Sequence, residues 1–181
     1  MQLKQLIIYV VRWLMTPFRQ AHRRKYADPE AEVIQHKELP NDAYLPIICK
    51  YVAAGESAVF LVKGFSMRPF LEHLRDKVEL SPWSDLHEGD AVLAELSPGH
   101  FVLHRIHSRQ GEQLTLKGDG NIQGVEHCTV QDVRGIVTKY IRPGGHVLTA
   151  DDPKLKRKIN RWVHLPTFLR RVYLFIYKQA L

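Results

Sequence analysis

The feature that most constrains the fold is a series of short apolar segments between residues 58 and 149. Each segment is rich in β-branched, aromatic or aliphatic residues and is bounded by Gly, Pro, Asp or Ser. Strands separated by such turns at short intervals are typical of an all-β core. The predicted strands are Ala58–Lys63, Val78–Leu80, Ala91–Leu96, Phe101–His107, Gln113–Lys117, Val133–Tyr140 and His146–Thr149. We therefore predict a mainly β domain over residues 44–150.

Helices are predicted on both sides of the β region. A helix from about Tyr44 to Ala54 follows a polar linker, residues 27–43, and begins the β domain. Residues 151–181 are expected to form two amphipathic helices, because Pro153 suits a first helical turn and Pro166 breaks the pattern. The second of these helices is apolar on nearly all sides, which is typical of a helix that lies on another surface.

The first 26 residues contain an apolar run, Leu3–Met15, followed by a basic stretch. The run is shorter than the roughly 20 apolar residues that a membrane-spanning helix needs, and Arg12 interrupts it. Tyr9 and Trp13 are of the type that anchors helices at membrane interfaces, and the cations that follow suit lipid headgroups. Residues 1–26 are therefore interpreted as an amphipathic, membrane-associating helix. The alternative is a helix that packs on its own domain or on a partner.

The net charge is +7, and the cations gather at Arg19–Lys25, Lys154–Arg161 and Arg170–Lys178. A basic balance suits anionic lipid, nucleic acid or acidic substrates. Because these cations border apolar and aromatic segments and no nucleic-acid motif is present, nucleic-acid binding ranks last. Cys49 and Cys128 have no metal-ligand spacing, so neither a metal nor another cofactor is expected.

Three segments of the β region carry residues suited to catalysis. Ser66 follows a predicted strand, in a turn that contains Gly64 and Pro69. A serine hydroxyl becomes a nucleophile when a neighbour removes its proton, and backbone N–H groups beside it can form an oxyanion hole. His104 lies within an apolar strand, where a core histidine is the alternative interpretation. Asp119 follows another strand, and taken alone it is a turn residue.

Together these segments resemble the type I signal peptidases and the self-cleaving repressors of the bacterial DNA-damage response. The nucleophile motif of that group, Gly-x-Ser-Met-x-Pro-x-Leu, is matched at every fixed position by Gly64–Leu71. Its Gly-Asp-x-Val strand is matched by Gly89–Val92, and its Lys-Gly-Asp-x-Asn motif by Lys117–Asn121. The base is a lysine in bacterial signal peptidases and repressors, and a histidine in archaeal, endoplasmic-reticulum and some sporulation-type enzymes. His104–Ile106 matches the histidine form, and the resemblance covers about residues 58–140.

The resemblance implies the signal-peptidase or repressor type of β-fold and a role for each motif residue. Ser66 attacks the scissile carbonyl, and His104 removes its proton and later gives it to the leaving amine. Histidine can act as a base near neutral pH without the burial that a lysine needs. Asp119 orients the imidazole as the third member of the triad, and Glu126 is the alternative for that role. The Ser66 N–H and a neighbouring donor form the oxyanion hole.

The expected function is a serine endopeptidase of signal-peptidase type that cleaves a peptide, leader or signal sequence at or near a membrane surface. The alternative is a non-catalytic peptide-binding pseudoenzyme, or an accessory protein for peptide maturation or export. No spanning segment directly precedes Ser66, and cations follow the N-terminal apolar run, so we expect a peripheral position on the cytoplasmic face of the membrane. A peptide or preprotein substrate, anionic lipid and a partner protein are the expected partners. Self-cleavage at Ala54-Gly55 is disfavoured, because this dipeptide lies at a predicted helix end.

Overall fold

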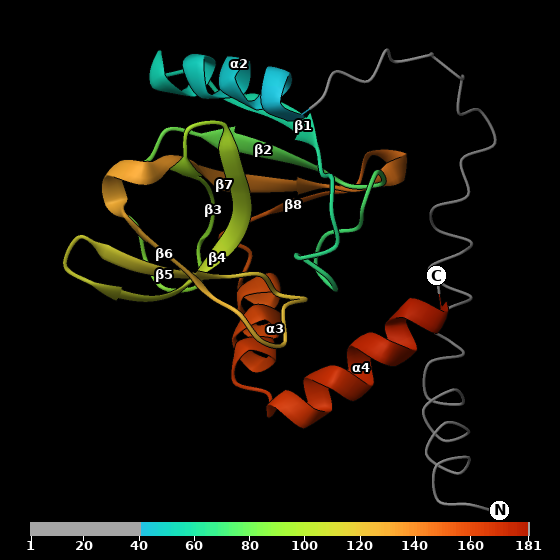
Figure 1. The fold of residues 1–181 in the computed structure, drawn as a ribbon. Helices are drawn as coiled ribbons and strands as arrows, with labels where there is room; N and C mark the ends of the chain where they lie inside the picture. Colours follow the sequence, from blue (N-terminus) through green and yellow to red (C-terminus); the bar gives the residue numbers. More distant parts are fainter. Residues whose placement is uncertain (1–40, 181) are drawn as a thin grey trace, which may run out of the picture.

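The computed structural model describes residues 41–180. Its centre is an antiparallel sheet with strand order β1-β2-β7-β3-β4-β5-β6, and an eighth strand, β8, pairs with β7 (Figure 1). The strands are β1 (Ala58–Leu61), β2 (Lys77–Ser81), β3 (Ala91–Ser97), β4 (His100–Gln110), β5 (Gln113–Lys117), β6 (Glu126–Thr129), β7 (Val133–Ile141) and β8 (Val147–Thr149). The mainly β core predicted from the short apolar segments is confirmed.

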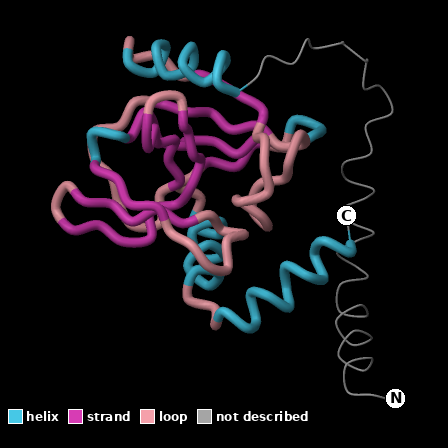
Figure 2. Tube along the Cα trace, in the orientation of Figure 1, coloured by secondary structure: helices cyan, strands magenta, loops and turns pink. Residues whose placement is uncertain are grey.

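Helices lie at opposite ends of this sheet. They are α2 (Asn41–Ala53), α3 (Pro153–Val163) and α4 (Thr167–Ala180). In Figure 2, α2 lies at the top of the sheet, α3 lies below it, and α4 leads away from α3. Among residues 41–180, no helix combines the length and the apolar character needed to cross a bilayer. The helix expected at residues 1–26 and most of the expected linker lie outside the described residues.

Glycine and proline residues form two of the turns that connect the strands. Gly99 has a φ of +76°, a conformation that suits glycine, and it closes the hairpin between β3 and β4. A 3-10 turn over Pro143–Gly145 joins β7 to β8. Strand β6 is missing from the sequence prediction because Glu126–Thr129 has a single apolar residue, Cys128, and no alternation. Pairing with β5 makes this segment a strand.

Two apolar clusters fill the domain. The larger one lies between the sheet and the helices α2 and α3. Its helical members are Leu45, Ile48 and Val52 from α2, and Leu155, Ile159 and Trp162 from α3. The smaller cluster lies around β3 to β6 and includes Cys128, a free thiol whose pKa burial raises to about 11. The apolar stripe predicted for the first C-terminal helix therefore completes the main core.

The start of α3 depends on Asp152, whose carboxylate accepts hydrogen bonds from the backbone N–H groups of Lys154 and Leu155, both at 2.8 Å. Asp152→Ala leaves both donors without this acceptor and should lower the free energy of unfolding by about 1 kcal/mol. Urea unfolding followed by circular dichroism measures the loss. Asp152→Asn is the matched control, because asparagine caps helices as well as aspartate does. An equal loss in both variants would contradict the capping role.

Candidate active site

Ser66 lies on a turn that the apolar core holds from one side. Strand β1 leads into this turn, and Met67, directly after Ser66, is only 2% exposed. Phe65, directly before it, is 54% exposed. Leu71 is fully buried and anchors the far end of the turn. This change from exposed to buried side chains places half-buried Ser66 at the boundary between solvent and core.

Local contacts hold the residues before and after the serine. Gly64 has a φ of +105°, which allows the chain to reverse, and its N–H donates to His73 Nδ1 at 2.9 Å. The His73 and Phe65 rings pack with their centroids 4.7 Å apart. The Arg68 guanidinium lies over the Phe65 ring, 4.2 Å from its centroid. Residues 64–71, called the nucleophile turn here after the role that the resemblance gives Ser66, are therefore held on the solvent side as well as on the core side.

The segment that follows β5 contacts the backbone of the nucleophile turn. The Gly120 N–H donates to the Ser66 carbonyl oxygen at 2.7 Å. A Cβ atom on Gly118 would lie 2.5 Å from the same oxygen, so a larger residue would force the backbone to move. The motif Lys117–Asn121 therefore positions the serine through its two glycines.

His104 lies on β4, next to the same segment. Arg105 is paired with Lys117 across β4 and β5, so the next position in this register brings His104 opposite Gly118. The imidazole is buried, and its Nδ1 lies 2.8 Å from Glu126 Oε2. When Nδ1 of a neutral imidazole donates to a carboxylate, Nε2 is the basic nitrogen. The imidazole and the nucleophile turn thus both adjoin Gly118.

In the structure, Asp119, the residue expected to orient His104, is paired with Arg105 instead. The Asp119 carboxylate is 2% exposed and accepts two hydrogen bonds from Arg105, at 2.9 Å from Nε and 2.6 Å from Nη2. Successive side chains of a strand point to opposite faces, so His104 and Arg105 cannot face the same carboxylate. Glu126, the alternative, makes the contact with the imidazole instead.

Two residues of the C-terminal helices also contact the segment after β5. The Asp119 carbonyl oxygen accepts hydrogen bonds from Trp162 Nε1 at 2.8 Å and from Arg170 Nη2 at 3.0 Å. Burial disfavours the charge on Arg105, but the Asp119 carboxylate and Tyr140 outweigh burial and hold the Arg105 pKa above its usual value. The contacts of Trp162 and Arg170 are not predicted from the sequence, because its pattern indicates only that α3 and α4 are amphipathic.

The site contains the groups needed for nucleophilic attack and proton transfer: a hydroxyl, an imidazole and a carboxylate. None of the hydrogen bonds among residues 41–180 joins Ser66 Oγ to His104. Such bonds are often long without substrate and tighten when substrate binds. Within the same residues, no cluster of His, Cys, Asp and Glu side chains is arranged to hold a metal ion.

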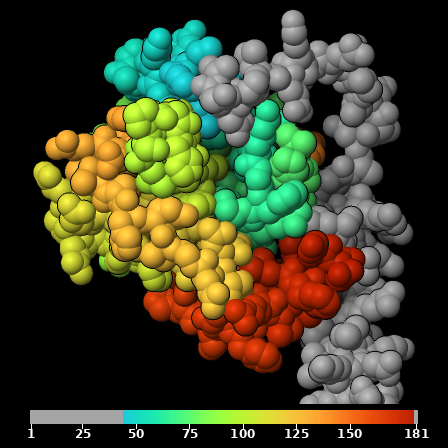
Figure 3. Space-filling model, in the orientation of Figure 1, coloured from blue at the N-terminus to red at the C-terminus, as the bar shows by residue number. Residues whose placement is uncertain are grey.

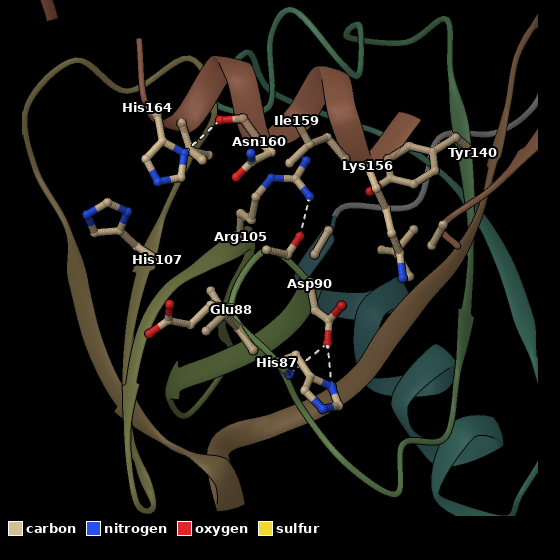
Figure 4. A pocket seen from close by; sticks show the side chains of 16 residues that line it. His87, Glu88, Asp90, Arg105, His107, Tyr140, Lys156, Ile159, Asn160 and His164 are labelled. Carbon is tan, nitrogen blue, oxygen red and sulfur yellow. Dashed lines mark hydrogen bonds and ion pairs between the residues drawn. The ribbon is translucent and has the colours of Figure 1, made fainter. Parts of the chain in front are cut away.

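A separate cavity of about 470 Å³ lies between α3 and the strands (Figure 4). Its lining includes Arg105, His107, Tyr140, Asn160 and His164. Arg105, which lines this cavity, follows His104 on β4 and points to the opposite face of the strand, so this cavity lies behind the imidazole. Neither Ser66 nor His104 lines it. The cavity and the candidate active site are therefore distinct, and the buried Arg105 lies between them.

Gly118→Ala tests the contact between the two turns. The added methyl group would overlap the Ser66 carbonyl, so we expect the free energy of unfolding to fall by about 1–3 kcal/mol. We also expect backbone amide NMR shifts to change in residues 64–71. Lys117→Ala, the preceding position, is the control and should leave those shifts unchanged. If the amide shifts of residues 64–71 were the same in Gly118→Ala as in the wild type, the contact between Gly118 and the Ser66 carbonyl would be contradicted.

The variants Asp119→Asn and Glu126→Gln test whether the two carboxylates have different roles, one in stability and one in orienting the imidazole. Asp119→Asn leaves Arg105 buried without a counter-charge and should lower the free energy of unfolding by about 3–5 kcal/mol. Glu126→Gln should cost less than about 1 kcal/mol, because Glu126 is partly exposed. It should instead change the tautomer of His104, seen in the nitrogen NMR shifts of the ring. Equal destabilisation with an unchanged tautomer would contradict this division of roles.

Comparisons of the chain with protein-family models, with curated proteins and with solved structures gave no match. The functional interpretation therefore depends on the residues of the site and their geometry. These are a serine turn, a histidine–glutamate pair, and the two glycines that bring the serine turn to the strand of the histidine.

Proposed function

We propose that the chain is a serine endopeptidase of signal-peptidase type, with Ser66 as nucleophile and His104 as general base. The observation that carries the proposal is the 2.8 Å contact between His104 Nδ1 and Glu126 Oε2, which favours Glu126 as the residue that orients the imidazole. This contact leaves Nε2 free to take a proton, on the strand that adjoins the nucleophile turn through Gly118. We extend the proposal to the fold, since the antiparallel sheet carries the four motifs in the order of the signal-peptidase and repressor group.

The proposed reaction proceeds through an acyl-enzyme. His104 Nε2 takes the proton of Ser66 Oγ as Oγ bonds to the scissile carbonyl carbon. The backbone N–H groups of Ser66 and Met67 have no acceptor among the described residues, so they are suited to bind the oxyanion. The imidazolium then donates its proton to the leaving amine, and the C–N bond breaks. Water attacks the acyl carbon and gives a proton to His104, which passes it to Ser66 Oγ as the Oγ–C bond breaks and the new carboxyl end of the peptide is released.

The edge of the sheet favours an extended peptide as substrate. Strand β1 is at the end of the strand order and pairs only with β2 among the described strands. Such an edge can receive an extended peptide by strand addition. Because β1 leads directly to Ser66, a peptide added there would run toward the hydroxyl. This geometry suits cleavage within a chain, and therefore an endopeptidase.

A non-catalytic peptide-binding protein is the competing function. The same edge would hold the peptide, and strand addition at β1 requires no contact between Ser66 and His104. The paired imidazole favours catalysis, because strand addition needs main-chain groups and side-chain pockets but no oriented base. We rank the peptidase first for that reason.

A fluorophosphonate probe tests the nucleophile. At mildly alkaline pH we expect label on Ser66, no label in Ser66→Ala, and labelling at least about 100-fold slower in His104→Ala, because the base is gone. His107→Ala is the matched control, since His107 is an exposed histidine of the same strand that lines the separate cavity. Peptide mapping by mass spectrometry measures the label. Equal labelling rates in the two histidine variants would contradict the assigned base.

Cleavage is tested with a library of extended peptides incubated with the wild-type and Ser66→Ala chains. Products that form only with the wild-type chain support an endopeptidase. The opposite result would be a folded wild-type protein that binds peptides but does not cleave them, with no probe label on Ser66. That result would contradict catalysis and would favour the peptide-binding alternative.

A further inference from the structure

The outward face of α4 is apolar at its centre. Phe168 and Phe175, two helical turns apart, are 72% and 59% exposed, and Leu169 is 45% exposed. Val172 lies between the two phenylalanines on the same side of the helix. A helix on the surface of a soluble domain normally has charged and polar residues on its outward face. Large aromatic side chains in this position indicate a surface that has a partner.

The inward face of α4 is already packed. Arg170 and Tyr177 are buried, and Arg170 bonds to the backbone of the segment after β5. Tyr173 packs against Trp162 of α3, with ring centroids 5.2 Å apart, and stacks on Tyr177 at 6.2 Å. These contacts fix the rotation of the helix about its axis. The exposed phenylalanines therefore cannot turn into the core without breaking them.

The charged side chains of α3 and α4 have a single sign. From residue 153 to residue 181 the sequence contains no Asp or Glu. The exposed cations of the two helices are Lys154, Lys156, Arg157, Lys158 and Arg161 on α3, and Arg171 and Lys178 on α4. Figure 3 shows the two helices, in red, on the side of the molecule away from α2. A second copy of the chain on this surface would bring like charges together, whereas an anionic surface would complement them.

We propose that the outward face of α4 docks in the plane of an anionic lipid surface, with Phe168 and Phe175 in the interfacial layer and the flanking cations at the headgroups. Apolar aromatic residues on one face and lysine and arginine beside them are the pattern of helices that lie in a membrane interface. The docked helix need not span the bilayer, because only its outward side enters the lipid.

Docking at α4 would place the candidate active site close to the lipid. Arg170, on the inward side of the helix, bonds to Asp119 in the segment that contacts Ser66. This consequence rests on the proposed peptidase function: the substrate would be a peptide held at a membrane surface rather than one free in solution. The lipid contact itself does not depend on chemistry at Ser66.

The full chain is tested by sedimentation with vesicles of phosphatidylcholine alone or mixed equally with phosphatidylglycerol. We expect binding to the anionic vesicles that weakens with salt, and at least about tenfold weaker binding in the double variant Phe168→Ser, Phe175→Ser. The matched control is Ile47→Ser, Tyr51→Ser on α2, whose side chains are 46% and 58% exposed. The control should bind as the wild type does. Hydrogen exchange of residues 167–180 should slow when anionic vesicles are added.

Several results would overturn the proposal. Binding that is equal in the α4 and α2 double variants would place the lipid contact elsewhere in the chain. Unchanged hydrogen exchange in α4 would do the same. A dimer that dissociates only in the α4 variant, measured by light scattering without lipid, would make a second copy the occupant. The Ser66→Ala chain should bind vesicles as the wild type does, so loss of lipid binding and loss of catalysis remain separate outcomes.

Discussion

The buried ion pair between Arg105 and Asp119 connects the sheet to the segment that contacts the backbone of Ser66. Arg105 is fixed by its strand, and it also donates to the Gly89 carbonyl at 2.7 Å at the start of the neighbouring motif. The main chain of Asp119 is held separately, by donors from α3 and α4. The carboxylate of Asp119 thus has its partner on β4, whereas the carbonyl oxygen of Asp119 has its donors on α3 and α4. Because the side chain and the main chain of Asp119 are both held, Gly118 and Gly120 are fixed in position against the nucleophile turn.

Much of the fold follows from local signals in the sequence. The short apolar segments, the Gly99 hairpin and the apolar stripe of α3 each appear in the structure where local chemistry predicts them. Strand β6 does not, because its four residues show no apolar alternation and its pairing partner is the strand β5. Residue propensities and apolar periodicity do not predict pairing between strands of this kind.

The candidate site shows the same division between local and non-local information. Ser66 and His104 are found from the motifs, because each motif is a continuous stretch of chain. The choice between Asp119 and Glu126 is different, since it depends on which face of β4 each carboxylate reaches. That depends on the register of β4 with β5 and of β5 with β6, which spacing in the sequence does not contain. Trp162 lies on the apolar side of α3, and no pattern in the sequence indicates the hydrogen bond from its indole N–H to the Asp119 carbonyl.

The hydrogen bonds from the C-terminal helices to the Asp119 carbonyl have a consequence for the order of synthesis. A chain made from its N-terminus completes all eight strands before α3 and α4 exist. The sheet and the Arg105–Asp119 pair can then form first, with the Asp119 carbonyl still lacking its helical donors. Final fixing of the segment beside Ser66 waits for the last part of this sequence to be translated and to fold back. A nascent chain therefore carries the serine and the histidine long before it can hold them in their final arrangement.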